Sequence, residues 1–90
     1  MPLYYFHLRD HVERLLDPQG LSINDPAKLG ERALKEARAI ISQDALAGVI
    51  NLDQRIEVED ESHSVVYVLP FVDAVRIVRD GHEHSGGQQA

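Results

Sequence analysis

Residues 65–71 (VVYVLPF) are apolar at every position, and this run constrains the fold more than any other feature of the sequence. A strand with one face in water alternates apolar and polar side chains, so a continuous apolar run indicates that both faces are covered. The rest of the chain offers only enough helix to cover one face of a sheet. We therefore expect the second face to meet another subunit or a partner protein.

Length and composition predict one small domain. At 90 residues the chain has room for one modest core, which we expect to span residues 1–79. Residues 80–90 contain three Gly, two Gln and almost no apolar side chains, a composition that predicts a disordered tail.

Charge and cysteine content exclude several classes of protein. The chain has no cysteine, which excludes disulfides and thiol chemistry and fits a cytoplasmic location. No signal peptide is recognisable, and no stretch approaches the roughly 20 apolar residues that span a bilayer. We therefore expect no membrane partner, and the formal net charge of −6, which repels phosphate, leads us to expect no nucleic-acid partner.

Alternating aromatic residues predict the first strand over residues 3–9. One side of this strand carries Tyr4, Phe6 and Leu8, and the other carries Tyr5, His7 and Arg9. The chain then turns back near Asp10, and residues 17–20 (DPQG) have Pro and Gly where a type I turn prefers them. The first third of the chain is therefore predicted to be a hairpin followed by a tight turn.

A helix is predicted to begin after Asp25, which can cap it, because Pro26 suits the first helical position. Gly48 is well placed to end the helix, and Gly30 inside its first turns allows tight packing there. Apolar residues recur at spacings of three and four and form one stripe that faces a sheet. The stripe consists of Leu29, Ala33, Leu34, Ala37, Ile40, Ile41 and Ala45.

Two further strands are predicted after the helix. Residues 55–59 alternate charged and apolar side chains, as a half-buried strand does, and residues 61–64 form the turn into the apolar run. Residues 72–78 fit either a short helix or an extended segment. The predicted fold class is α+β, with the order ββαββ, a four-stranded antiparallel sheet and one helix packed on one face.

Three segments of the chain resemble a family of short bacterial proteins, domain of unknown function 6894. They are residues 1–10 (MPLYYFHLRD), 17–41 and 55–75. The matching motif positions are Pro2, residues 4–6, His7, Arg9, Asp10, Asp17, Gly20, Asp25, Pro70 and Phe71. The resemblance covers roughly residues 1–78 and implies the same fold, while the family brings no established activity with it.

The order of an aromatic strand, an acidic turn with Gly, a second strand and an Ala-rich helix also resembles HicB-type antitoxins, which have a partial ribonuclease-H-like fold. That resemblance implies an antitoxin that binds a small basic toxin, which the acidic charge permits. No segment after Phe71 looks like a DNA-binding element.

Histidines are the first candidates for chemistry. His7 is a candidate general base, with the carboxylate of Asp10 or Asp17 nearby to hold it. A histidine at a surface or interface is nevertheless the more common case. His11 and His63 lie in predicted turns and would form a metal pair if those turns met. In the tail, His82, Glu83 and His84 form a weak metal-binding pattern, for which incidental composition is the simpler interpretation.

Carboxylates crowd the strand at 55–59 and the turn after it, and a hard cation is the ligand such a cluster would hold. The cluster consists of Asp53, Glu57, Glu59, Asp60 and Glu61. The spacing lacks a calcium-binding loop, so a solvated strand face that opposes aggregation is the simpler interpretation. We expect no metal, no cofactor and no catalytic residue.

These observations favour a non-catalytic protein-interaction or regulatory module that self-associates as a homodimer. The predicted interface consists of Tyr5, His7, Arg9, Tyr67 and Leu69. Two alternatives remain, a small enzyme with its site at a dimer seam and an antitoxin that neutralises a basic toxin.

Overall fold

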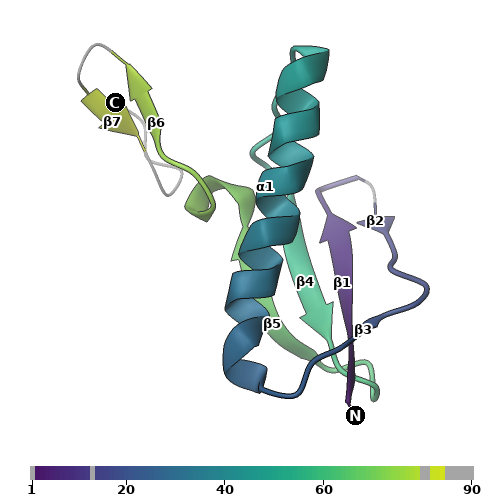
Figure 1. The fold of residues 1–90 in the computed structure, drawn as a ribbon. Coiled ribbons are helices and arrows are strands. Elements are labelled where there is room, and N and C mark those ends of the chain that lie inside the picture. Colours follow the sequence, from purple (N-terminus) through teal and green to yellow (C-terminus); the bar gives the residue numbers. More distant parts are fainter. Residues whose placement is uncertain (1, 13, 80–81, 85–90) are drawn as a thin grey trace.

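One antiparallel sheet and one helix form the body of the molecule (Figure 1). The computed structural model describes residues 2–12, 14–79 and 82–84. The main sheet contains β1 (Leu3–Arg9), β2 (Arg14–Leu15), β3 (Leu21–Ser22), β4 (Arg55–Glu59) and β5 (Val65–Pro70). Its strand order is β2-β1-β4-β5, and β3 also pairs with β1. The helix α1 (Leu29–Ala47) crosses one face, which confirms the predicted α+β class.

The first hairpin differs from the prediction because its return strand is split in two. β2 pairs with Leu8 and Arg9 at one end of β1, and β3 pairs with Leu3 and Tyr4 at the other. Pro18 lies between the two short strands and has no N–H to donate to a ladder. The middle of β1 therefore has no strand beside it on this edge.

The helix begins and ends where the sequence predicts. Asp25 accepts a hydrogen bond from the Ala27 N–H at 3.0 Å, and Pro26 opens a short 3-10 helix, η1 (Pro26–Lys28), that leads into α1. At the other end Gly48 adopts φ 91° and donates its N–H to the Ala45 carbonyl at 3.1 Å. A left-handed cap of this kind suits glycine, which has no Cβ to clash.

The core lies between α1 and the inner face of the sheet. The strand register places Phe6, Val58 and Tyr67 in one row across β1, β4 and β5, and Leu8, Ile56 and Leu69 in another. The buried apolar side chains are Ile23, Leu29, Ala33, Ala37, Ile41, Ile56, Val58, Leu69, Phe71 and Ala74. The predicted helix stripe is thus confirmed at four positions, whereas Leu34 and Ile40 are half-buried and Ala45 is exposed.

Close contact between α1 and the sheet depends on glycine at position 30. A Cβ atom at Gly30 would lie 3.2 Å from the Tyr67 hydroxyl oxygen, closer than ordinary van der Waals contact. The predicted tight packing is therefore present, and it shows that the Tyr67 side chain points toward the helix.

After β5 the chain leaves the body of the molecule. The short 3-10 helix η2 (Phe71–Asp73) is followed by β6 (Ile77–Arg79), so the ambiguous segment 72–78 contains both helical and extended backbone. β6 pairs with β7 (His82–His84) in a two-stranded sheet that projects away from α1 (Figure 1). Residues 82–84, which the sequence places in a disordered tail, thus form a strand. The other residues of that predicted tail, 80, 81 and 85–90, lie outside the described ranges.

Replacing Ile41 with alanine should lower the free energy of unfolding by about 2 kcal/mol, the low end of the range for such truncations. Ile41 retains 9% of its exposure and lies in the second half of α1, where the structure can relax around the gap. Lys35→Ala, on the exposed side of the same helix, should leave stability nearly unchanged. Urea unfolding measures both, and equal midpoints would contradict this orientation of the helix.

Within the described ranges, no helix combines the length and the apolar character that crossing a membrane requires.

Candidate functional site

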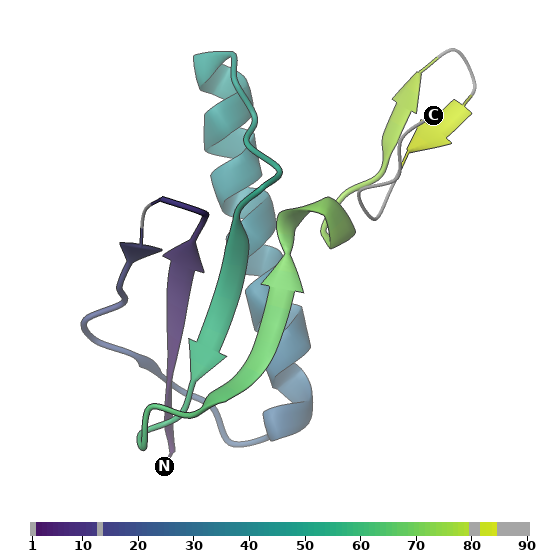
Figure 2. The same cartoon turned by 180° about the vertical axis from the view of Figure 1, so that it is seen from behind.

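The sheet face opposite α1 is not covered by any other element of the described chain (Figure 2). Directly paired residues of antiparallel strands share a face, so the register identifies the side chains on it. They are Tyr5, His7 and Arg9 of β1, Arg55, Glu57 and Glu59 of β4, and Val68 and Pro70 of β5. We call these residues the open face. It combines ionisable side chains on two strands with an apolar strand beside them.

Glu57 lies at the centre of the ion pairs on the open face. Its two carboxylate oxygens accept hydrogen bonds from Arg9 Nη1 at 2.9 Å and from Arg55 Nε at 2.7 Å. Burial alone would raise the pKa of Glu57, but the hydrogen bonds and charges of the two guanidinium groups outweigh it and lower the pKa. Because Glu57 exposes only 7% of its surface, the interpretation of a solvated carboxylate face is wrong at this position.

His7 is buried on the same face, not exposed as a surface histidine would be. Its Nδ1 accepts a hydrogen bond from the Asp17 N–H at 3.0 Å, and its Nε2 lies 3.3 Å from Glu59 Oε1. An accepting Nδ1 places the proton of the neutral ring on Nε2, the nitrogen that faces the Glu59 carboxylate. Both ring nitrogens are therefore engaged. These partners come from Asp17 and Glu59, while the Asp10 carboxylate accepts a hydrogen bond from the Val12 N–H at 2.8 Å.

The Asp17 carboxylate takes the place of a neighbouring strand at the unpaired middle of β1. Its carboxylate accepts hydrogen bonds from the N–H groups of Phe6 at 3.2 Å and of Gln19 and Gly20 at 3.1 Å each. Burial alone would raise the pKa of Asp17, but these backbone hydrogen bonds outweigh it and lower the pKa. The Phe6 N–H thus finds in a carboxylate the acceptor that a neighbouring strand would otherwise supply.

Glycine at position 20 is required by the same turn. Gly20 has φ +74°, and a Cβ atom there would lie 2.8 Å from a ring carbon of Tyr5. An L residue would therefore suffer both backbone strain and a clash. Asp17 and Gly20, which look like parts of a binding motif, instead hold the loop between β2 and β3 against β1.

β5 forms the opposite edge of the sheet. Among the described residues, no strand or side chain caps its outer backbone groups as β2, β3 and Asp17 do for β1. Within the described ranges β5 pairs only with β4, and four consecutive side chains on it (Val65, Val66, Tyr67 and Val68) are exposed, with Val68 at 44%. Hydrogen-bonded and non-hydrogen-bonded pairs alternate in an antiparallel ladder. Because the Phe71 N–H donates to the Gln54 carbonyl at 2.9 Å, the Arg55–Pro70 pair is non-hydrogen-bonded, and so is Glu57–Val68. The backbone N–H and C=O of Val68 consequently point away from β4.

The five predicted interface residues lie on two different faces. Tyr5, His7 and Arg9 come together on the open face, whereas Tyr67 and Leu69 point toward α1, and Leu69 exposes only 8% of its surface in the core. The sequence reasoning missed Val68. The all-apolar run carries no signal that would show which face Val68 occupies, and the bulge opposite Glu59 breaks the alternation at Val65 and Val66.

Among the described residues, no three His, Asp or Glu side chains are placed to hold a metal ion. His11 follows the end of β1 at Arg9 and His63 follows the Glu59 end of β4, so these two histidines lie at opposite ends of the sheet and form no pair. The side chains of His82, Glu83 and His84 lie outside the described part of the structure.

Three other members of the acidic cluster, Glu59, Asp60 and Glu61, have local partners. Glu59 Oε1 also lies 3.6 Å from His63 Nδ1, and the Asp60 carboxylate accepts hydrogen bonds from Ser62 and Ser64 within the β4–β5 turn. The Glu61 carboxylate accepts from the Leu3 N–H at 3.3 Å. These carboxylates stabilise strand ends and turns and do not converge on one point.

Comparison with known proteins gives one match. No curated protein and no solved structure matches the chain. A family model described as a domain of unknown function matches residues 3–72, which include both edges of the main sheet and the whole of α1. This match lends no support to the resemblance to HicB-type antitoxins. The chain therefore belongs to the family of the domain of unknown function DUF6894.

Proposed function

We propose that this protein is a non-catalytic interaction module of the cytoplasm that forms a homodimer by pairing the β5 edges of two copies. The observation that carries the proposal is the contrast between the two edges of the sheet. The β1 edge is closed by β2, by β3 and by the Asp17 carboxylate, whereas β5 leaves backbone groups and apolar side chains exposed. Natural sheets protect an edge of this kind unless it has a partner.

The composition of β5 favours a second copy as that partner. No charged residue occurs between positions 64 and 72, so two copies can approach along this strand without like-charge repulsion despite the net charge of −6. Antiparallel pairing of identical strands generates a closed two-fold dimer, the most common symmetric assembly. Such a dimer would join the two sheets into one and bring together the Val68 side chains on a shared open face.

The engagement of His7 supports a role without catalysis. A general base needs a nitrogen within reach of a substrate proton, and both nitrogens of His7 already have partners inside the protein. The neighbouring carboxylate of Glu57 is held by two arginines. Binding through backbone and apolar groups of β5 requires none of these side chains.

Val68→Pro should convert the dimer to a monomer, as measured by light scattering or sedimentation at high micromolar concentration. The Val68 N–H points away from β4, so proline removes a hydrogen bond to the second copy while leaving the β4–β5 ladder intact. Val68→Lys should act in the same direction by placing a charge at the seam. Val12→Lys is the matched control, because Val12 exposes 91% of its surface far from β5.

A monomeric wild-type protein at these concentrations would refute the homodimer. A dimer that survives both Val68 substitutions, with the melting temperature unchanged, would show that the interface lies elsewhere.

A further inference from the structure

Three arginines lie side by side on the sheet face opposite α1, at the end of the sheet where β1 ends and β4 begins. The strand register pairs Arg9 of β1 directly with Arg14 of β2 on one side and with Arg55 of β4 on the other. Directly paired residues share a face, so the three side chains form one row across three strands. We call these residues the arginine row. Three of the nine Lys and Arg residues of an acidic chain are thus gathered in one place.

Such a row costs stability, because like charges directly opposite each other on neighbouring strands repel. Glu57 compensates the pair of Arg9 and Arg55 by bonding to both. The Arg14 side chain forms no ion pair or hydrogen bond within the described part of the chain, so nothing there offsets its repulsion from Arg9. A local arrangement that the fold does not compensate is expected at functional sites.

Glu57 also fixes the orientation of two of the three guanidinium groups. Its buried carboxylate holds Arg9 and Arg55 by one hydrogen bond each, while 34% and 31% of the two arginine side chains remain exposed. A guanidinium group has five N–H donors, so others remain for an external acceptor. The Arg9 Nε is buried and has no hydrogen-bond partner among the described residues, although buried donors normally have one.

A hollow of about 360 Å³ adjoins the arginine row and gives it a concave border. The described residues that line the hollow are Leu8, Arg9, Asp10, Arg14, Leu15 and Gln54. The lining therefore combines two cations of the row with apolar surface. A volume of this order is typical of small-molecule sites.

Acidic side chains near the arginine row do not neutralise it. Glu57 carries one negative charge, and Asp10 in the lining of the hollow carries another. The Asp10 carboxylate accepts a hydrogen bond from the Val12 N–H at 2.8 Å. Asp53, in the turn before β4, forms no ion pair with any of the three arginines. Three guanidinium groups thus face two carboxylates, and the excess of positive charge attracts an anion.

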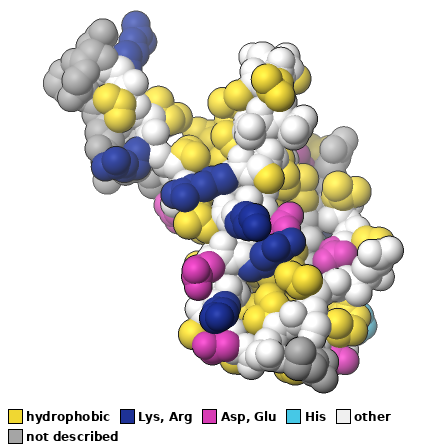
Figure 3. All heavy atoms as spheres, in the orientation of Figure 1, with side chains coloured by type: hydrophobic (Ala, Val, Ile, Leu, Met, Phe, Trp, Pro, Cys, Tyr) yellow, Lys and Arg dark blue, Asp and Glu magenta, His cyan; other side chains and the backbone are white. Residues whose placement is uncertain are grey.

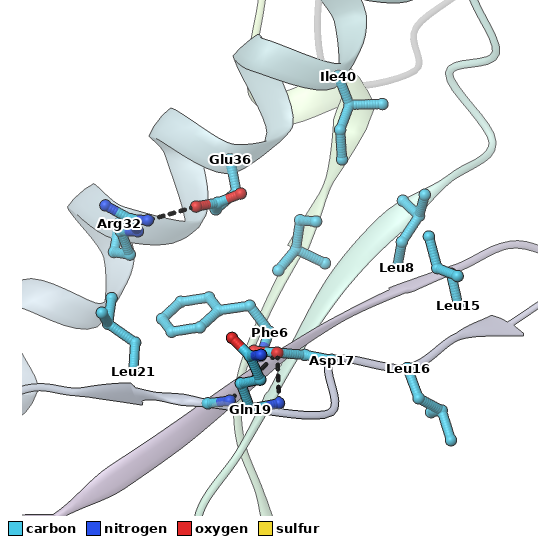
Figure 4. Close-up of a pocket in the computed structure, with 12 residues that line it drawn as sticks. Phe6, Leu8, Leu15, Leu16, Asp17, Gln19, Leu21, Arg32, Glu36 and Ile40 are labelled. Carbon is cyan, nitrogen blue, oxygen red and sulfur yellow. Dashed lines mark hydrogen bonds and ion pairs between the residues drawn. The ribbon is translucent and has the colours of Figure 1, made fainter.

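Cations in other parts of the described structure are matched more closely by acidic groups. On the α1 side of the molecule, Lys and Arg side chains lie among Asp and Glu side chains (Figure 3). A second hollow lies between α1, β1 and the loop from β2 to β3 (Figure 4). The carboxylates of Asp17 and Glu36 line it together with Arg32, which already pairs with Glu36 at 2.7 Å. Neither region has the excess of positive charge found at the arginine row.

We propose that the arginine row binds the phosphoryl group of a small phosphorylated molecule. A phosphoryl group carries nearly two negative charges and three acceptor oxygens at neutral pH, so it can accept hydrogen bonds from guanidinium groups on neighbouring strands at once. A carboxylate has one charge and two oxygens and satisfies fewer of these donors. Leu8 and Leu15 offer apolar surface to the rest of the molecule. None of the three arginines lies on β5, so this inference does not depend on the homodimer.

Titration of the full chain with phenyl phosphate, at neutral pH and constant ionic strength, tests the proposal. Calorimetry should report saturable binding of one molecule per chain, and amide chemical shifts should move at the arginine row. Arg14→Gln should weaken binding by about tenfold, the loss of one charge-assisted interaction. Its melting temperature should stay at the wild-type value, because Arg14 is exposed. Lys35→Gln is the matched control, since it removes an exposed cation from α1 and should leave the affinity unchanged.

Further measurements test the charge of the site and the kind of ligand. Asp10→Asn should strengthen binding, because it removes a negative charge from the lining of the hollow. Acetate should bind at least about tenfold more weakly than phenyl phosphate. Absence of saturable binding, an unchanged affinity in Arg14→Gln, or equally tight binding of acetate would overturn the proposal. So would binding only to phosphatidic acid vesicles or only to DNA.

Discussion

Replacing Phe71 with alanine should lower the free energy of unfolding by about 3–5 kcal/mol, the range for removing a fully buried aromatic side chain. Phe71 has no exposed surface and is the largest side chain in the core. It follows directly after β5, and its N–H donates to the Gln54 carbonyl at 2.9 Å, so the backbone around it is fixed and cannot collapse into the space left by the ring. Such a loss is large for a domain of this size.

Chemical denaturation with a fluorescence or circular dichroism signal measures this effect. Leu46→Ala is the control, because Leu46 is also a large apolar residue but exposes 82% of its surface near the end of α1. We expect that variant to unfold at nearly the wild-type midpoint. A Phe71→Ala variant with wild-type stability would mean that the segment after β5 does not close the core.

Much of the fold could be predicted because the decisive signals are local. Asp25 and Pro26 mark the start of the helix, and Gly48 marks its end, through backbone chemistry that needs no distant partner. Tyr4, Phe6 and Leu8 alternate with polar neighbours, so their face could be assigned from the sequence alone.

The placement of Tyr67 and Leu69 could not be predicted in the same way. A run that is apolar at every position indicates that both faces of the strand are covered. Because it contains no alternation, it does not show which residues face the helix. The close approach of Tyr67 to Gly30 decides this, and it depends on a contact between segments far apart in the sequence.

The candidate site was less predictable than the fold for a related reason. Glu57 appears in the sequence as one charge in an exposed, alternating strand, and only the register with β1 brings Arg9 onto its carboxylate. The burial of His7 likewise depends on Glu59 from another strand and on the Asp17 N–H. Side-chain pairing across strands is a property of register, which a single sequence does not reveal.

Asp17→Ala should lower the free energy of unfolding at neutral pH by about 3 kcal/mol, because hydrogen bonds to a charged group are among the stronger ones. The substitution removes the acceptor of three backbone N–H groups. The Phe6 N–H, in the middle of β1, is then left without the acceptor that closes this edge of the sheet. Asp53→Ala removes the same charge at an exposed position and should cost little.

The same substitution should change how stability depends on pH. The pKa of Asp17 is lower in the folded protein than in the unfolded chain, where an aspartate has a pKa of about 3.9. Because the pKa is lowered by folding, the carboxylate stabilises the fold fully when the pH is above its pKa in the unfolded chain. This contribution is lost as the pH falls through its pKa in the folded protein. Wild type should therefore lose stability more steeply than Asp17→Ala below about pH 4.

Urea unfolding of wild type, Asp17→Ala and Asp53→Ala at a series of pH values separates these effects. Glu57 also has a lowered pKa, but this carboxylate is present in all three proteins, so the difference between the curves isolates Asp17. Wild type and Asp17→Ala should converge in acid, where the Asp17 carboxylate is protonated in both states. Parallel curves would show that its charge does not stabilise the fold and that the β1 edge is held by β2 and β3 alone.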